Sequence, residues 1–571
     1  MNTNVLRAKM GGGLLVFLLL ALVLPSWLIQ NDRVINVDEP RWIVRGANFY
    51  YAVTHGEFDK TIFEYHPGVT NMWIVATAMH IYFPEYRGQG QGYFDPLKQK
   101  FEEFMRKNDK EALELVRISR YIHAGVLAAT AVVALILLSR LVGSMAALLG
   151  MVLAVVSPFY LGHSRLMNLE GMLSLFVLVS FLGLQVYLNK ERRLVYLLVS
   201  GAAFGLAQLT KSSSIVVIGL AGLMIFVGLF KPGEYTIKAK VWDAIKVFFI
   251  WFGAAALVYF VLWPGMWVAP GKMLAEVYGN ALSYAFQGAR LDVTEDLSPD
   301  GFSLDSGLGG VLHFIKAWAS SSTPVTWLGL ILVVFFLLKK GEKVSQRSTH
   351  VYLLILGVLF ILMFGFAQGR DSQHYILSSY VAFDILAGMG WAYFLRTLQE
   401  RWEVLNRPYF LLAALLVLTS AQISFGLPYA PYYFNYKAPL ASVPATYGYG
   451  EGYSEAADYL AQKPNAGALR AYVYNGMGTF SYFFPGETIL FKRVYILDDD
   501  FETISADMHQ SDYLVLYPIV REKQPETEKI LAKLEGVVEP EKVIYIHGLE
   551  YLQIYRIADI PEEFYQTLGR P

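Results

Sequence analysis

Two acidic residues near the start of this 571-residue sequence have the type and position to act as a base. Asp38 and Glu39 are adjacent in Asn36-Val37-Asp38-Glu39-Pro40-Arg41, directly after the first long apolar run. A carboxylate in such a position can take the proton of a substrate hydroxyl group. An isolated acidic pair also begins many solvated helices, and Pro40 suits the first position of such a helix. Both readings of the pair remain open from the residues alone.

Three basic residues stand alone in short turns between apolar runs. They are Arg165 in His163-Ser164-Arg165, Lys211 in Thr210-Lys211-Ser212 and Arg370 in Gly369-Arg370-Asp371. The orientation derived below places all three turns outside, where Lys and Arg are disfavoured. Each cation can reach the membrane interface or pair with a nearby acid. Because all three share one side with the acidic pair, they can instead converge on one anionic group, such as a lipid phosphate.

Two further residues are candidates for contact with a substrate. His66 lies in Glu64-Tyr65-His66-Pro67-Gly68, after a segment from Arg41 to Val53 that we expect to form an amphipathic helix on the surface. A single histidine more often has a structural role. Glu170 begins a later apolar run and can either neutralise Arg165 or contact a substrate.

The composition indicates a membrane protein. Apolar residues make up 55% of the chain and charged residues 17%, well below the roughly 25% typical of soluble domains. The 47 basic residues are balanced by 48 acidic ones, so the basic excess of a nucleic-acid-binding protein is missing. Because there is no cysteine, disulfides, thiolate nucleophiles and cysteine-based metal sites are excluded.

About eleven apolar runs approach the roughly 20 residues that a membrane-spanning helix needs. They lie near 12–29, 117–139, 144–161, 169–188, 194–210, 213–230, 244–263, 325–338, 350–368, 375–395 and 409–427. We therefore expect a polytopic α-helical membrane protein. No small-residue cleavage site follows the first run, so we interpret it as an uncleaved anchor.

The distribution of Lys and Arg predicts the orientation in the cytoplasmic membrane. With the N-terminus inside, every inside loop is basic, from Arg140 through Lys190 and Lys231 to Lys339 and Arg396. Eleven spans place the C-terminus outside. Three larger segments, about 30–116, 264–324 and 440–571, then also lie outside.

The last of these segments predicts a small α/β domain. Strands are expected at Arg470–Tyr474, Tyr513–Tyr517 and Lys542–Ile546, with helices at Glu451–Leu460 and Gln524–Leu534. The sequence thus predicts a membrane module over residues 1–439 and an extracytoplasmic α/β domain over residues 440–571.

A series of short motifs resembles a known enzyme class. In chain order they are Asp38-Glu39-Pro40-Arg41, His66-Pro67-Gly68-Val69, Ser164-Arg165 with Glu170, Leu209-Thr210-Lys211, Thr323-Pro324, Gly369-Arg370 through Tyr375, and Gly448-Tyr449-Gly450-Glu451-Gly452. Over about residues 10–460 the sequence resembles the polyprenyl-phosphate-dependent glycosyltransferases of the GT-C class. It is most similar to family 39, which includes protein O-mannosyltransferases and lipid A aminoarabinose transferases. Gly68, Glu170 and His374 depart from the motifs, which usually have Pro, Asp and Arg there.

The resemblance implies transfer of a sugar from a polyprenyl-phosphate donor to a lipid, glycan or protein acceptor outside the cytoplasmic membrane. Asp38 would be the general base, with Glu39 as a competitor for that role, and a single displacement would invert the anomeric carbon. Developing charge on the phosphate requires fixed cations, and the candidates are Arg41, Arg165, Lys211 and Arg370. His66, Glu170, His374 and Tyr375 are candidate substrate-site residues.

Two alternatives bear on this reading. The acids Asp38, Glu39 and Glu170 are too few to favour a metal ion, so we expect no required cofactor, although a divalent metal remains an alternative. A transporter or flippase of lipid-linked sugars would also explain many spans. It predicts inverted repeats and charges at the bilayer midplane, and the sequence shows neither.

Overall fold

The computed structural model describes residues 12–29, 33–98, 100–230, 236–288, 306–338, 344–368, 372–439, 441 and 448–568. The chain divides into two compact units. Unit 1 consists of Met1–Ile29, Ala52–Ile74 and Tyr121–Ser442. Unit 2 consists of Gln30–Tyr51, Val75–Arg120 and Val443–Pro571. The C-terminal segment therefore forms one unit with two parts of the first 120 residues.

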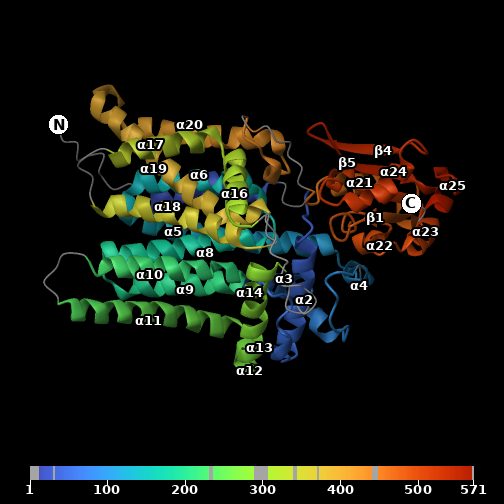
Figure 1. Ribbon diagram of the computed structural model, residues 1–571, viewed down its shortest axis with the longest axis horizontal. Helices are drawn as coiled ribbons and strands as arrows, with labels where there is room; N and C mark the ends of the chain where they lie inside the picture. Colours follow the sequence, from blue (N-terminus) through green and yellow to red (C-terminus); the bar gives the residue numbers. More distant parts are fainter. Residues whose placement is uncertain are drawn as a thin grey trace. The chain divides into compact units, whose positions relative to one another are not determined.

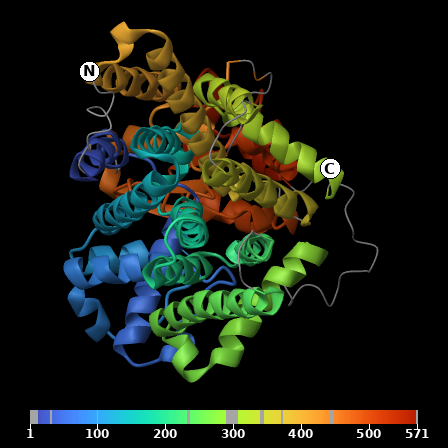
Figure 2. The ribbon, with the colours of Figure 1, turned by 90° about the vertical axis from the view of Figure 1, so that its left-hand side faces the viewer.

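Unit 1 is a bundle of helices, several of which lie side by side in Figure 1 and are seen nearly end-on in Figure 2. Apolar chain of this length folds as helices in a membrane because each helix satisfies its own backbone hydrogen bonds. The helices are α1 (Gly12–Leu28), α5 (Ala112–Val142), α6 (Ser144–Val155), α7 (Pro158–Ser164), α8 (Leu169–Asn189), α9 (Leu194–Thr210), α10 (Val216–Gly228), α11 (Ile237–Leu262), α12 (Gly265–Val268), α13 (Pro270–Leu274), α14 (Asn280–Gln287), α16 (Leu308–Ser321), α17 (Pro324–Leu338), α18 (Val344–Phe366), α19 (Leu377–Arg401) and α20 (Pro408–Gly426).

The expected apolar runs lie on these helices, with the run 144–161 divided between α6 and α7, but fewer helices qualify as spans by length and composition. Among the described residues, 5 helices are long and apolar enough to cross a membrane, or up to 7 if each of two bent pairs is one span. The bent pairs are α6 with α7, at 65°, and α16 with α17, at 112°. The helices α1, α9 and α10 are apolar but shorter. The chain is a multi-pass membrane protein, and the count of eleven spans stays a prediction.

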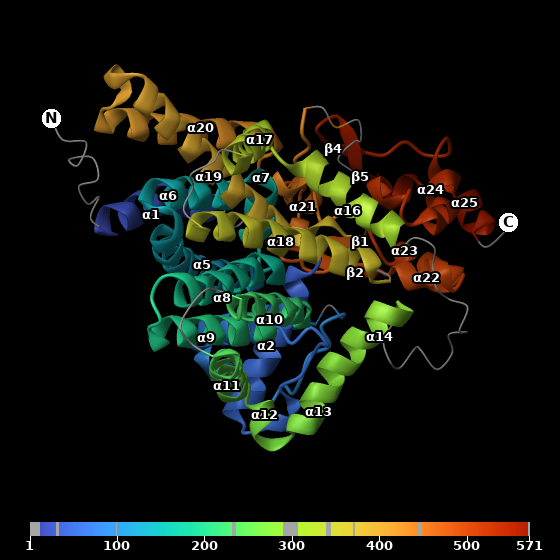
Figure 3. The ribbon, with the colours of Figure 1, turned by 60° about the vertical axis from the view of Figure 1, so that its left-hand side comes forward.

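Helix α19 packs against α6, α8, α17 and α18, and Figure 3 shows it beside α6 and α17. Glycines allow this close packing. A Cβ atom on Gly388 would lie 2.4 Å from the backbone of Gly150, and one on Gly390 would lie 2.1 Å from the carbonyl oxygen of Gly329. Small residues at such crossings let helix backbones approach closely where lipid supplies little hydrophobic driving force.

Unit 2 contains helices and one mixed sheet. Its helices include α2 (Glu39–Thr54), the C-terminal part of α3 (Val69–Tyr82), α4 (Phe101–Lys107), α21 (Tyr453–Ala461), α22 (Arg493–Leu497), α23 (Phe501–His509), α24 (Glu528–Leu534) and α25 (Glu562–Thr567). Helix α2 confirms the helix expected from Arg41 to Val53. The expected surface position was wrong, because residues 42–50 are all buried.

The sheet has five strands in the order β2-β1-β3-β5-β4. Its strands are β1 (Arg470–Tyr474), β2 (Glu487–Phe491), β3 (Tyr513–Leu516), β4 (Lys542–Ile546) and β5 (Leu549–Arg556). Strand β1 pairs in parallel with β2 and β3, whereas β5 is antiparallel to both β3 and β4. The expected strands correspond to β1, β3 and β4, while β2 and β5 were not expected.

Candidate active-site residues

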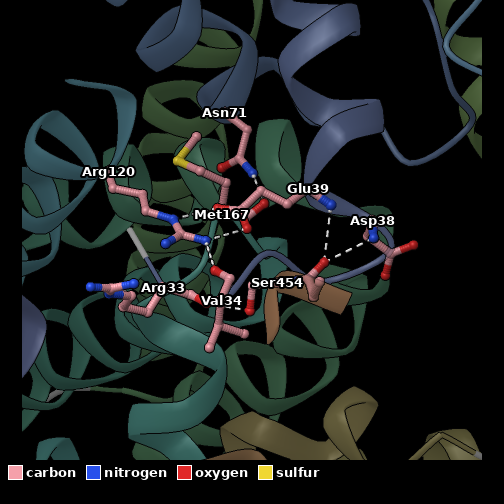
Figure 4. A network of polar contacts seen from close by, with 9 residues as sticks. Arg33, Val34, Asp38, Glu39, Asn71, Arg120, Met167 and Ser454 are labelled. Atoms are coloured by element: carbon pink, nitrogen blue, oxygen red, sulfur yellow. Dashed lines mark hydrogen bonds and ion pairs between the residues drawn. The ribbon is translucent and has the colours of Figure 1, made fainter. Parts of the chain in front are cut away.

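The candidate base lies at the start of α2 in unit 2 (Figure 4). The side-chain oxygen of Asn36 accepts hydrogen bonds from the backbone N–H groups of Asp38 and Glu39, at 2.8 and 3.0 Å. The backbone N–H of Trp42 then donates to the Asp38 carbonyl oxygen at 3.1 Å, which begins the helix. Asn36 thus satisfies N–H groups that a helix N-terminus would otherwise leave unpaired, and it fixes the backbone that carries both acids.

The two adjacent acids have different environments. Glu39 accepts hydrogen bonds from Arg120 Nε at 2.7 Å and from Arg120 Nη2 at 2.5 Å, and both side chains are buried. Arg120 also donates to the carbonyl oxygen of Val34 at 2.5 Å. Figure 4 shows the Asp38 carboxylate pointing away from this pair. Since the Asp38 side chain is 38% exposed and that of Glu39 is 0% exposed, Asp38 is the acid that solvent reaches.

The Asp38 carboxylate has two close partners within unit 2. The hydroxyl group of Tyr449 donates to Asp38 Oδ2 at 2.8 Å. Arg41 Nη1 lies 3.8 Å from Asp38 Oδ1, one helical turn further on. Tyr449 is thus a hydrogen-bond donor to this carboxylate, and Arg41 is a nearby cation.

Tyr449 is itself held by a buried acid. Glu451 Oε2 accepts hydrogen bonds from the Tyr449 backbone N–H at 2.5 Å and from the Tyr517 hydroxyl at 2.6 Å. Burial, with the neighbouring Glu451 carboxylate, raises the pKa of the Tyr517 phenol well above its ordinary value, so Tyr517 stays a donor. Gly448, Gly450 and Gly452 have φ angles of 62°, 110° and 84°, which explains the spaced glycines around Tyr449.

In unit 1, Lys211 and Glu170 form a buried ion pair. Lys211 Nζ donates to Glu170 Oε1, and the two side chains are only 4% and 6% exposed. The same nitrogen lies 4.4 Å from the centre of the Tyr375 ring, in a cation–π contact. Glu170 was expected to neutralise Arg165 or contact a substrate; the ion pair that the structure gives it is with Lys211.

The His66 turn lies beside the turn that carries Lys211. The backbone N–H of Gly68 donates to the Thr210 carbonyl oxygen at 3.2 Å, and the hydroxyl groups of Thr70 and Thr210 are 2.8 Å apart. Gly68 has φ at 59°. Proline is fixed near −65°, so this backbone conformation explains why glycine replaces the proline of the family motif. The half-buried His66 ring lies 4.0 Å from the Tyr65 ring.

Arg165 follows α7 and is largely buried. Its guanidinium donates to the carbonyl oxygen of Ile29 and lies 5.1 Å from the centre of the Tyr433 ring. The neighbouring Ser164 hydroxyl accepts from the indole N–H of Trp27 at 3.1 Å. These contacts fix the Arg165 side chain at the end of α1.

His374 and Tyr375 precede α19. The ring of His374 lies 5.3 Å from that of His163, and both histidines are buried. Tyr375 stacks on Phe364 with ring centres 5.3 Å apart. Arg370, the remaining expected phosphate-binding residue, lies outside the described residues.

The structure therefore brings several of the expected site residues into two groups, while the contacts described for Arg165 are with Ile29 and Tyr433. In unit 1, Tyr375 contacts Lys211, which pairs with Glu170, and the His66 turn bonds to the turn before Lys211. In unit 2, Asp38 lies beside Arg41, and Glu39 is held by Arg120. Sequence reasoning missed the roles of Tyr449 and Arg120, although the spaced glycines marked the Tyr449 loop. Within the described part of the chain, no three His, Asp or Glu side chains gather as metal ligands would.

Comparisons with known proteins show which class this arrangement resembles. Residues 116–267 match the model of the dolichyl-phosphate-mannose-protein mannosyltransferase family. The structure of ArnT from Cupriavidus metallidurans bound to undecaprenyl phosphate is similar, with a TM-score of 0.51 and 12% identity, covering 94% of this chain and 97% of that chain. The apo structure of the same protein gives a TM-score of 0.52 and 12% identity, covering 96% and 98%. No curated protein sequence matches the chain.

The prediction of a GT-C-class glycosyltransferase agrees with the family match over residues 116–267, and the similarity to ArnT shows a related fold. The matched segment contains Arg165, Glu170 and Lys211, which the structure places in unit 1. The individual roles of these residues, the orientation in the membrane and the division at residue 440 stay predictions.

Proposed function

We propose that this protein transfers a sugar from a polyprenyl-phosphate carrier to an acceptor on the outer side of the cytoplasmic membrane. The observation that carries the proposal is the buried cation of Lys211, which pairs with Glu170 and contacts the ring of Tyr375. Lys211 and Glu170 both lie within the segment that matches the family. A buried ionisable pair in a membrane protein is costly and usually serves a function. The similar ArnT structure binds undecaprenyl phosphate, which supports a lipid phosphate as the ligand of this cation.

Lys211 and Arg165 bind the donor phosphate in this proposal, and Arg41 and Arg370 are further candidates. The leaving group is a lipid phosphate monoester, whose charge increases as the glycosidic bond breaks. Fixed cations stabilise that charge without reorganisation of solvent. Glu170 holds the Lys211 side chain, and the neighbouring His66, His374 and Tyr375 are candidates for contact with the sugar or the phosphate.

Asp38 acts as the general base. It takes the proton of the acceptor hydroxyl group, whose oxygen forms a bond to the anomeric carbon. The bond from that carbon to the phosphate oxygen breaks, and its electron pair leaves with the phosphate. A single displacement of this kind inverts the anomeric carbon. Asp38 is favoured over Glu39 because Glu39 is buried and both its oxygens bind Arg120.

The proposed topology is that expected from the basic loops. The N-terminus is inside, about eleven helices span the membrane, and the α/β domain from about residue 440 is outside. The acceptor is a lipid, a glycan or a protein, and membrane lipids surround the bundle. No metal cofactor is required in this proposal. A flippase function is not favoured, because the matching family is one of sugar transfer.

The test is transfer by the purified protein. It is incubated with membranes and a panel of radiolabelled polyprenyl-phosphate hexoses and pentoses, with and without a chelator. We expect label from one donor to move to a membrane acceptor in both conditions. The result that would overturn the proposal is passage of the lipid-linked sugars across liposome membranes without loss of the sugar. Loss of transfer only with chelator would overturn the metal-independent mechanism.

A further inference from the structure

We infer that Tyr449 is a positioning residue, which orients the Asp38 carboxylate and tunes the pH dependence of transfer through the hydrogen bond from its hydroxyl group. The inference rests on the proposed function, since it assumes that Asp38 is the base. Both residues belong to unit 2, where Asp38 begins α2 and Tyr449 precedes α21.

The hydrogen bond leaves one carboxylate oxygen for a substrate. Tyr449 donates to Asp38 Oδ2 at 2.8 Å, whereas Oδ1 has Arg41 at 3.8 Å, beyond ordinary hydrogen-bond distance. The Tyr449 side chain is buried, but that of Asp38 is 38% exposed. The phenol therefore fixes the carboxylate from the protein side while Oδ1 stays accessible to a hydroxyl group.

The loop that carries Tyr449 is built to hold the phenol in this position. The backbone N–H of Tyr449 donates to the Glu451 carboxylate at 2.5 Å, and the carbonyl oxygen of Tyr449 accepts from the Val37 N–H at 3.4 Å. The Val37 contact joins the Tyr449 backbone to the residue directly before Asp38. The hydroxyl group of Tyr517 donates a hydrogen bond to the same Glu451 oxygen at 2.6 Å. The base and its donor are therefore tied together through both side chain and backbone.

Among the described residues, Tyr449 donates a short hydrogen bond to the Asp38 side chain from a distant segment. Arg41, on the same helix, is the nearest cation. The Glu39 carboxylate forms an ion pair with Arg120. The Glu451 carboxylate accepts hydrogen bonds from the Tyr517 hydroxyl group and from the Tyr449 backbone N–H. A hydrogen bond to the charged form of a carboxylate favours that form. Removing this hydrogen bond should therefore change the pH dependence of the transfer reaction.

The experiment compares pH–rate profiles of wild-type protein and Tyr449→Phe, using the donor that proves active and membranes as acceptor. We expect the acidic limb of the kcat/KM profile to shift to higher pH by about one unit in the Phe variant. Incorporation of a fluorinated tyrosine at position 449 strengthens the donor, so the limb should move downward. A purely structural role would not produce shifts of opposite sign.

The matched control is Tyr474→Phe, which removes another hydroxyl group of unit 2, hydrogen-bonded to Gln524 at 2.6 Å. Its profile should equal that of the wild type. Asp38→Asn separates the two proposals. If Asp38→Asn is inactive and both Tyr449 variants keep the wild-type profile, the inference about Tyr449 is wrong and the base stands. If Asp38→Asn stays active, the assignment of the base itself is wrong.

Discussion

Glu39 and Arg120, 81 residues apart in the sequence, form a buried ion pair with two hydrogen bonds, of 2.7 and 2.5 Å. The pair joins the start of α2 to the N-terminal part of α5, Ala112–Arg120, which belongs to unit 2 although the rest of α5 lies in unit 1. It also separates the roles of two adjacent acids. Glu39 is held within the fold by Arg120, whereas the partly exposed Asp38 is the acid that we propose as the base.

The ion pair leads to a prediction about stability. Glu39→Gln should lower the free energy of unfolding by about 3–5 kcal/mol, because it leaves the buried Arg120 charge without its anionic partner. Thermal unfolding of the purified protein in detergent measures the change. The double variant Glu39→Gln with Arg120→Met should recover part of the loss. Asp38→Asn is the control, since its side chain is more than a third exposed. Equal melting temperatures for Glu39→Gln and the control would contradict the structural role.

A second prediction concerns binding of the donor phosphate in unit 1. Glu170→Gln leaves the Lys211 cation in place and should keep or increase affinity for undecaprenyl phosphate. The double variant Lys211→Met with Glu170→Gln removes both charges and leaves no buried acid unpaired. It should bind about 10–100-fold more weakly, which corresponds to the loss of one hydrogen bond to a charged group.

Binding of undecaprenyl phosphate to the detergent-solubilised variants checks this second prediction. Lys272→Ala is the matched control, because Lys272 is an exposed cation of the same unit that donates to the backbone carbonyl oxygen of Asp59 at 3.3 Å. If the double variant binds as the wild type does, Lys211 serves only to neutralise Glu170.

A third prediction follows from the backbone at Gly68. With φ at 59°, an alanine there should cost about 1–2 kcal/mol and loosen the turn that bonds to Thr210. Thermal unfolding of Gly68→Ala measures this cost. Gly271→Ala provides the comparison, because a Cβ atom there meets nothing within 4 Å. Should both variants melt at the same temperature, the strained turn is not what selects glycine.

Many helices and strands of this fold could be predicted from the sequence. The pairs that distant side chains form with one another could not. The strands β1 and β3 contain β-branched and aromatic residues in short runs, and both were predicted. Strand β5 has Glu550 and Gln553 within it, so its pattern does not distinguish it from a loop. The motifs also identified Asp38 and Lys211 as candidates, because an acid and a cation in those places suit sugar transfer from a phosphate.

The pairing of these residues depends on contacts that no local pattern encodes. Glu170 is five positions from Arg165, yet its ion pair is with Lys211, 41 positions away. Tyr449 lies 411 positions from Asp38. Periodicity describes which face of one element is buried, and it carries no information about which distant side chain fills the space opposite. The helices α1, α9 and α10 were counted as spans on apolar character, although they are shorter than the usual span length.

A fourth prediction concerns pH and unit 2. Burial raises the pKa of Glu102 above its ordinary value, although the hydrogen bond from Ser481 at 2.6 Å acts in the opposite direction. A raised pKa in the folded state means that the folded protein binds this proton more tightly than the unfolded chain does. The contribution of Glu102 to stability is therefore complete below its ordinary pKa and is lost as pH rises through the raised value.

Glu102→Gln is neutral at every pH and should remove this loss. The melting temperature of the variant minus that of the wild type should therefore increase as pH rises from about 4 to 8. The measurement is thermal unfolding across that range. Glu103→Gln, at the exposed neighbouring position, should follow the wild type. A constant difference between Glu102→Gln and wild type across the range would show that Glu102 does not bind its proton differently in the folded state.

The most direct test of the account is the turnover of Asp38→Asn with a radiolabelled polyprenyl-phosphate sugar, measured beside its binding of the same donor. Asparagine keeps the size of the side chain but cannot accept the proton at neutral pH. We predict a fall in turnover of about 10²–10⁴-fold with donor binding unchanged, as expected for loss of a general base. Turnover near the wild-type value in a folded Asp38→Asn protein would contradict it.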